Sequence, residues 1–237
     1  AIIAHDLSKR FGHTLALDRF NLAVARGQIF GLLGPNGAGK STAIKILTTL
    51  LDATSGSASV AGFDVAQNPI KVRQHIGYVP QMLSADGQLT ARENLNLSAR
   101  LYGLHGAMRV SRVNDALAFA GLHEVSGNLV RTYSGGMIRR LEIAQATLHF
   151  PKVLFLDEPT IGLDPNQIRA VRQLIKSLAE SHTVLISTHI LPEAEMTCNR
   201  MVIMYEGKIL AADTPENLQR LMSGNSQVIA EIAAPSD

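Results

Sequence analysis

The sequence contains one cysteine, Cys198, in 237 residues, so no disulfide can form within a single chain. No apolar run comes near the roughly 18 residues that a membrane-crossing helix needs, and the apolar blocks are as short as IFGLLG and MVIM. A basic and then apolar leader is missing at the start, and the first residue is Ala1 rather than Met, as expected of a processed or trimmed chain. These absences predict a protein of the reducing cytoplasm that does not span a membrane, with Cys198 as a small buried hydrophobic residue.

A strong excess of either charge is missing as well. The chain has 22 Lys and Arg against 20 Asp and Glu, which gives a formal charge of +2 at pH 7. This excess is too small to favour nucleic acid as a partner, and we expect none. The 46% of hydrophobic and 18% of charged residues are ordinary for a folded protein that buries a core, so global disorder is excluded.

The arrangement of apolar residues predicts an α/β protein. Short runs at residues 15–17, 20–24 and 28–33 indicate strands, and the middle of the chain, at about residues 90–149, has a helical pattern throughout. From residue 153 onward, strands alternate with helices. Such alternation implies a mainly parallel sheet covered by helices, with the helical middle inserted between two parts of that sheet as a second lobe.

Periodicity also predicts where helices start and which faces they bury. Residues 41–51 form a helix after a glycine-rich turn, with a buried stripe that includes Leu50. In the middle segment, Thr90 and Glu93 have the spacing of a capping box, and a later helix buries a face that includes Val110.

The stretch GPNGAGKS, residues 34–41, matches the phosphate-loop pattern G-x-x-x-x-G-K-[ST] between a predicted strand and a predicted helix. The glycines let backbone N–H groups turn inward around phosphate oxygens, and the helix N-terminus adds partial positive charge. Lys40 then reaches the β- and γ-phosphates, and the Ser41 hydroxyl binds Mg²⁺. The alternative is a glycine-rich turn that only caps a helix. The predicted nucleotide-binding residues here are Gly34, Pro35, Asn36, Gly37, Ala38, Gly39, Lys40, Ser41 and Thr42.

The choice of base is narrowed by a further absence. Guanine-specific phosphate-loop proteins usually carry an Asn-Lys-x-Asp base reader, and the dipeptide Asn-Lys occurs nowhere in this chain. Adenine is therefore favoured, held by a less specific contact such as stacking. Phe11, in the turn KRFGH, offers an aromatic face for stacking; the alternative is that Phe11 belongs to the core.

Two acids, Asp157 and Glu158, end the apolar stretch VLFLDE. Asp157 suits Mg²⁺ held through water, because this ion keeps much of its hydration shell. Glu158 is placed to orient or polarise an attacking water. A helix N-cap is the alternative for either acid, but the next helix is predicted to start at Asp164 instead.

His189 and Gln81 follow two further strands, TVLIS and IGYVP. Parallel sheets gather their ligands at the C-terminal edge, so we expect His189 to contact a γ-phosphate there, against the alternative of a structural histidine. The amide oxygen of Gln81 is a candidate ligand of Mg²⁺ or of water.

Taken in their order along the chain, these motifs resemble those of the nucleotide-binding domain of an ATP-binding cassette (ABC) transporter, and the resemblance covers essentially the whole chain. The resemblance implies an α/β P-loop NTPase fold with a mainly parallel core sheet, an N-terminal antiparallel β subdomain and an inserted α-helical lobe. The ATPase domain then spans residues 1–222, with the helical lobe at about residues 88–149. The resemblance also implies that Phe11 stacks on adenine, that the loop of Gln81 joins the two lobes, and that the loop ending at Asp164 crosses to a partner subunit. It implies catalytic roles for Lys40, Glu158 and His189. The implied metal ligands are Ser41, Gln81 and Asp157.

The stretch RTYSGGMIRR resembles the family's signature motif, because Ser134, Gly135 and Gly136 match the serine-glycine-glycine core of that motif. A helix start is a ready anion site. The resemblance implies that, in a head-to-tail dimer, this one closes over the γ-phosphate bound by a second copy. Tyr133 and Met137 replace the usual leucine and glutamine, and the form YSGGM resembles the branch that powers drug, antibiotic, polysaccharide and lipid exporters.

The resemblance thus implies an ATPase subunit that uses ATP and Mg²⁺, dimerises with a second copy and drives integral-membrane permease subunits from the inner face of the cell membrane. A soluble ABC ATPase that acts on ribosomes or DNA is the alternative. A module that binds nucleotide without turnover is disfavoured because Lys40, Glu158 and His189 are all present. The tail, residues 223–237, is either the start of a β segment, as SQVIAEIAAPSD indicates, or a frayed end.

Overall fold

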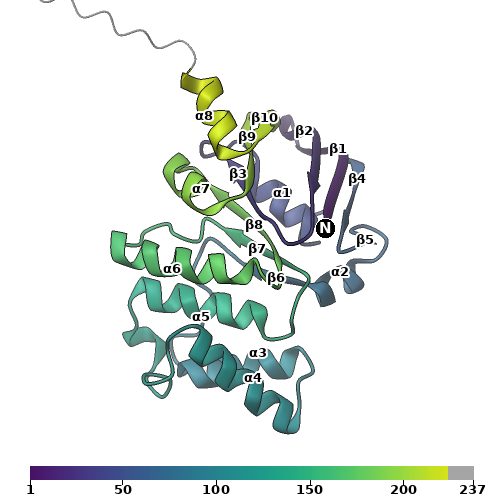
Figure 1. The fold of residues 1–237 in the computed structure, drawn as a ribbon. Coiled ribbons are helices and arrows are strands. Elements are labelled where there is room, and N and C mark those ends of the chain that lie inside the picture. The colour runs from purple at the N-terminus through teal and green to yellow at the C-terminus, as the bar shows by residue number, and fades with distance from the viewer. Residues whose placement is uncertain (224–237) are drawn as a thin grey trace, which may run out of the picture.

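The computed structural model describes residues 1–223, so the tail segment SQVIAEIAAPSD lies outside the described residues. The strands form two sheets (Figure 1). An antiparallel sheet has the order β2-β1-β4-β5 and consists of β1 (Ile2–Phe11), β2 (Thr14–Val24), β4 (Ser55–Val60) and β5 (Phe63–Asp64). The core sheet has the order β10-β9-β3-β8-β7-β6 and consists of β3 (Ile29–Leu33), β6 (Ile76–Val79), β7 (Val153–Asp157), β8 (Thr183–Thr188), β9 (Arg200–Tyr205) and β10 (Lys208–Asp213).

The core sheet is parallel from β6 to β9, and only β10 at its edge runs antiparallel to its neighbour. Every residue of β3, β7 and β8 is buried, as expected of parallel strands covered on both faces. Alternate residues of β7 enter separate clusters: Phe155 packs with the antiparallel sheet and α1, whereas Leu154 and Leu156 pack with α6. The α/β fold with an N-terminal antiparallel sheet is confirmed.

The helices are distributed over both faces of the core sheet and the inserted lobe (Figure 1). They are α1 (Lys40–Leu47), α2 (Pro69–His75), α3 (Ala91–Leu101), α4 (Gly106–Phe119), α5 (Gly135–Thr147), α6 (Pro165–Leu178), α7 (Leu191–Thr197) and α8 (Pro215–Ser223), with a short 3₁₀ helix, η1 (Val130–Thr132), before α5. None of the helices in the described part of the chain is long and apolar enough to cross a membrane.

The helical lobe has a core of its own, in which α3, α4 and α5 meet around Leu95, Leu117 and Leu141. The predicted capping box is present, because the Thr90 hydroxyl accepts from the backbone of Glu93 while the Glu93 carboxylate accepts from Thr90. The lobe therefore packs through a hydrophobic centre separate from those on the two faces of the sheet.

Three expectations about the limits and buried faces of single helices and strands were wrong. The predicted strands 15–17 and 20–24 belong to one strand, β2, which continues through Arg19 by a shift of register against β1. The helix after the phosphate loop ends at Leu47 rather than Leu51, because Thr49 adopts φ 63°, and Leu50 is exposed. Val110 is also exposed, since α4 buries other residues against the lobe.

The predicted helical middle is likewise interrupted. Between α4 and α5 the chain forms turns and η1, so the segment is not helical throughout. Cys198 is buried as predicted, and this burial raises the pKa of its thiol to about 12. A thiol in this state is chemically inert at neutral pH, which agrees with a packing role.

Candidate active site

The phosphate loop leaves β3 at Gly34 and enters α1 at Lys40, and its path requires glycine at two places. A Cβ on Gly34 would lie 2.3 Å from the carbonyl oxygen of Met204. Gly39 adopts φ 99°, and a Cβ there would lie 2.6 Å from the carbonyl oxygen of Ala16. The loop therefore passes directly against the backbone of neighbouring segments, where no side chain fits.

The loop encloses a cavity of about 300 Å³, with a lining of Ala16, Asn36, Gly37, Ala38, Gly39, Lys40, Ser41, Thr42, Gln81 and Glu158. Helix α1 begins here without a side-chain cap, whereas α3, α5 and α6 are capped by Thr90, Ser134 and Asp164. The first N–H groups of a helix have no acceptor within the helix, and phosphate oxygens bind well there. The residues present thus fit the triphosphate of a nucleotide.

Lys40 lies inside this loop, almost fully buried. Its Nζ donates to the carbonyl oxygens of Gly34 (2.7 Å) and Pro35 (3.1 Å) and forms an ion pair with Glu158 Oε1 at 3.3 Å. Both charged residues are only 5% exposed. The ammonium group is therefore held at the base of the cavity by the loop's own backbone and by the acid at the end of β7.

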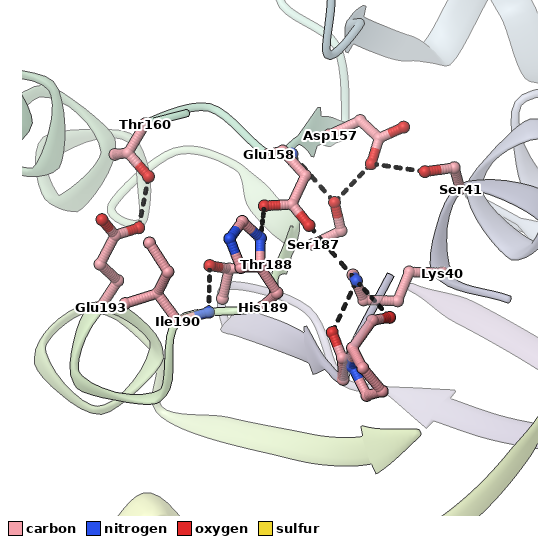
Figure 2. A network of polar contacts seen from close by, with 12 residues as sticks. Lys40, Ser41, Asp157, Glu158, Thr160, Ser187, Thr188, His189, Ile190 and Glu193 are labelled. Atoms are coloured by element: carbon pink, nitrogen blue, oxygen red, sulfur yellow. Dashed lines mark hydrogen bonds and ion pairs between the residues drawn. The ribbon is translucent and has the colours of Figure 1, made fainter. Parts of the chain in front are cut away.

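Asp157, the last residue of β7, contacts both the phosphate loop and the neighbouring strand β8 (Figure 2). Its Oδ1 accepts from the Ser41 hydroxyl at 3.2 Å and from the Ser187 hydroxyl at 2.5 Å. Asp157 and Ser187 are direct register partners in the parallel pair β7 and β8, which explains why they meet. The carboxylate is thus oriented from both sides.

Glu158 is the centre of the arrangement in Figure 2. Its backbone adopts φ 50°, and its N–H donates to the Ser187 hydroxyl at 2.9 Å. One carboxylate oxygen faces Lys40, and the other lies 2.8 Å from His189 Nδ1. A non-glycine residue in the left-handed region is strained, and such strain persists where surrounding contacts impose it. This geometry suits a general base whose carboxylate is held between a lysine and a histidine.

Oxygen ligands for a hard cation converge at the same edge. The Ser41 hydroxyl, the Asp157 carboxylate and the Gln81 amide are suitable for Mg²⁺, which binds few carboxylates and completes its shell with water and phosphate oxygens. Gln81 and Ser41 line the same cavity, and Ser41 contacts Asp157. Among the described residues, no cluster of three or more His, Cys, Asp or Glu could hold a metal ion by itself. The donor set fits Mg²⁺ bound together with a nucleotide.

Phe11 and Asp164 are not part of the cavity lining. Phe11 is 48% exposed at the end of β1, so the alternative of a core residue is wrong; the Nζ of Lys9 lies 5.1 Å from its ring centroid. Asp164 caps α6 by accepting from the N–H groups of Asn166 and Gln167. The predicted start of that helix at Asp164 is confirmed.

The signature residues also lie outside the cavity lining. Ser134 caps α5, and its hydroxyl accepts from the Met137 N–H at 3.3 Å. A Cβ on Gly136 would lie 2.8 Å from the side chain of Gln167, so this glycine lets the start of α5 approach α6 closely. Tyr133 is buried in the helical lobe, where its hydroxyl donates to the Val125 carbonyl at 2.6 Å.

Ser187 is a site residue that the sequence patterns missed. It orients Asp157 and binds the backbone of Glu158, yet the sequence pattern shows it only as part of an ordinary strand. Its signal was the one hydroxyl at the end of TVLIS, beside another strand that ends in an acid. Recognising it required the strand order, because β7 and β8 are separated by α6 in the sequence.

Comparisons with known proteins agree with this geometry. The family model described as ABC transporter matches residues 17–161. The daunorubicin resistance ATP-binding protein DrrA2 of Streptomyces coeruleorubidus is 43% identical over 236 residues, covering 98% of this chain and 73% of the relative. The probable multidrug ABC transporter ATP-binding protein YbhF of Escherichia coli K12 is 42% identical over 230 residues, covering 95% of this chain and 39% of the relative.

One solved structure is similar to this chain in both fold and sequence. It is a dimeric ATP-binding cassette in a post-hydrolysis state with bound ADP and Pi, and it matches with a TM-score of 0.81 and 26% identity over 91% of this chain and 99% of its own. The chain therefore belongs to the ABC transporter family, and it contains the family's ATP-binding and ATP-hydrolysing domain.

Proposed function

We propose that this chain is the ATPase subunit of an exporter, that it dimerises head-to-tail on ATP, and that it drives separate membrane subunits. Support comes from relatives named for daunorubicin resistance and as a multidrug transporter component. The YSGGM form of the signature supports the same branch. The alternative of a soluble ATPase acting on ribosomes or DNA has no comparable support among these relatives.

The residues at the sheet edge receive specific roles in this proposal. Lys40 binds the β- and γ-phosphates, and the N–H groups of residues 34–42 surround their oxygens. Glu158 orients the attacking water and accepts its proton, while His189, held through Nδ1, uses Nε2 toward the γ-phosphate. Ser41, Gln81 and Asp157 would hold Mg²⁺, which would supply positive charge beside the phosphates.

The dimer proposal rests on one observation: the signature residues do not line the cavity of their own phosphate loop. Ser134, Gly135 and Gly136 form a helix start, which suits an anion, but the phosphate cavity is lined by other segments. The composite site is complete when a second copy supplies its signature residues, with the loop ending at Asp164 crossing between the copies. Phe11, exposed at the end of β1, is then the stacking partner of adenine.

A surface for membrane subunits is proposed beside Gln81. Met82 and Leu83 directly follow it and are 82% and 49% exposed, and Leu101 on α3 is 79% exposed. The segment is held along α3 because the Asp86 N–H donates to the Asn94 side chain. Permease subunits docking there would place the protein on the inner face of the cell membrane and connect their movement to Gln81. We propose residues 1–222 as the ATPase domain that does this.

The mechanism is tested by Glu158→Gln, which keeps the shape of the side chain and removes its basicity. We expect kcat to fall by a factor on the order of 10² to 10⁴, the usual contribution of a general base. Added ATP should then trap the dimer, which size-exclusion chromatography or ultracentrifugation detects. The matched control is Glu180→Gln, an exposed acid outside the site, which should keep normal turnover. An unchanged rate in Glu158→Gln, with no ATP-stabilised dimer, would refute the proposal.

A further inference from the structure

A contact outside the nucleotide cavity joins the segments that carry Glu158 and His189. The hydroxyl of Thr160, in the loop after Glu158, donates to Oε2 of Glu193, in the first turn of α7 after His189 (Figure 2). Both side chains are half-buried. They also line one small cavity of about 20 Å³ with Pro159, so the two segments meet closely there.

The contact closes a ring around the proposed catalytic pair. From Glu158 the chain runs to Thr160, crosses the hydrogen bond to Glu193, returns along the chain to His189 and crosses the 2.8 Å contact back to Glu158. Two polar contacts thus complete a ring whose other connections are covalent. Opening one of them removes a restraint on the other.

The segment between His189 and Glu193 is short and held by internal hydrogen bonds, so a displacement of Glu193 should also displace His189. The Ile190 N–H donates to the Thr188 hydroxyl at 3.1 Å, and the carbonyl of Ile190 accepts from the N–H of Glu193 at 3.2 Å. On the other side, the Ile161 N–H donates to the Glu158 carbonyl at 3.2 Å, which tightens the loop that contains Thr160. Both arms of the ring are therefore compact turns.

We propose that Glu193 is a positioning residue for ATP hydrolysis: through Thr160 it holds the loop after Glu158 against the helix after His189, and so keeps imidazole and carboxylate aligned. The inference rests on the proposed roles of Glu158 and His189. Lys40, Ser41 and the rest of the phosphate loop lie outside the ring. Loss of the contact should therefore lower turnover and leave ATP binding nearly unchanged.

The test compares variants that remove the hydrogen bond with variants that keep it. Glu193→Ala removes the acceptor and Thr160→Val removes the donor, whereas Glu193→Gln and Thr160→Ser retain an oxygen that accepts or a hydroxyl that donates. We expect kcat to fall by a factor on the order of 10 to 100 in the first pair, because small misplacements of reacting groups are costly. The second pair should keep most of the turnover, and KM for ATP should change little in all four.

A double variant separates a shared effect from two unrelated ones. If Thr160 and Glu193 act through their mutual contact, combining Thr160→Val with Glu193→Ala should lower kcat no further than one change alone. Fully additive losses would contradict the inference, as would equal losses in the conservative variants. A rise in KM without a change in kcat would also overturn it, since that result indicates an effect on binding.

Glu195→Ala is the matched control. Glu195 lies on the same short helix, and its side chain makes no hydrogen bond or ion pair with the described residues, so its removal should leave kcat unchanged. Glu158→Gln, measured in parallel, distinguishes the two levels of failure. If Glu158→Gln retains turnover, the proposed catalytic role fails; if Glu158→Gln is inactive while Glu193→Ala turns over normally, only the positioning role of Glu193 fails.

Discussion

His149 shows how one residue can make the stability of the chain depend on pH. Its Nε2 lies 2.9 Å from the Ile76 carbonyl oxygen, and its ring stacks on Tyr102 with the centroids 3.8 Å apart. Its Nδ1 is buried without a partner in the described part of the chain. Burial lowers the pKa of His149, with smaller effects from His182 and His75, while the Ile76 carbonyl opposes the shift.

This depressed pKa predicts acid sensitivity with a definite sign. Above the ordinary pKa of 6.5 the imidazole is neutral in both states, and as pH falls below it the unfolded chain gains a proton that the folded chain resists. The free energy of unfolding, measured in urea, should therefore fall between about pH 7 and about pH 5. His149→Gln, which cannot be protonated, should make that fall smaller.

The matched control is His123→Gln, an exposed histidine whose side chain forms no hydrogen bond, ion pair or ring stacking with the described residues. It should retain the full dependence of stability on pH. An equally steep fall in His149→Gln and in the unmodified chain would show that other groups cause it.

At the scale of elements, two buried charges on α5 hold the loop that contains Gln81. Arg139 is 1% exposed and Glu142 3% exposed, and they form an ion pair at 3.0 Å. Arg139 donates to the carbonyls of Pro80 (2.7 Å) and Gln81 (2.8 Å), while Glu142 accepts from the N–H groups of residues 84 and 85. The helix that begins with the signature is therefore fastened to the loop of the nucleotide cavity.

Removing Arg139 should be costly. Arg139→Met leaves Glu142 charged and buried, with two loop carbonyls deprived of donors, and breaking such a pair costs about 3 to 5 kcal/mol. Urea denaturation measures the loss of unfolding free energy. Arg100→Met, on the exposed surface of α3, is the control and should stay within about 0.5 kcal/mol. A similarly small change in Arg139→Met would show that the fastening contributes little.

At the scale of the whole molecule, the phosphate cavity and the signature belong to different parts of one subunit. The phosphate loop lies at the edge of the core sheet, and the signature begins α5, which packs into the helical lobe (Figure 1). Closure of the proposed dimer would bring the lobe of one copy over the nucleotide of the other. Removal of the γ-phosphate would then weaken closure, which is how hydrolysis could be coupled to movement.

Ser134→Arg tests this arrangement, because a long side chain at the helix start should block closure while leaving the same subunit's phosphate loop intact. ATP affinity of the monomer should be nearly unchanged, and the ATP-stabilised dimer seen with Glu158→Gln should disappear when both changes are combined. Thr90→Arg is the control, since it also removes an N-cap, worth about 1 kcal/mol, but on α3. Loss of ATP affinity in the Ser134→Arg monomer would contradict the assignment.

Much of the site was predictable because its signals are local. The phosphate loop, the two acids at the end of β7 and the histidine after β8 each mark the end of a buried strand, and parallel strands end at one edge. Asp164 and Thr90 were predictable as helix caps for the same reason, since a cap depends on residues within one turn. The limits of helices were less predictable: Thr49, in a left-handed conformation, ends α1 before the apolar stripe does.

The sequence by itself determined the fold class, the family and the chemical character of the residues at the sheet edge, because these depend on motifs a few residues long. Only the tertiary structure decided which distant residues meet. Ser187 orients Asp157 because β7 and β8 are neighbours, and Thr160 meets Glu193 because the loop after β7 and the start of α7 after β8 lie side by side. Such contacts join residues about 30 positions apart, and their partners are set by strand order and packing, which no local pattern contains.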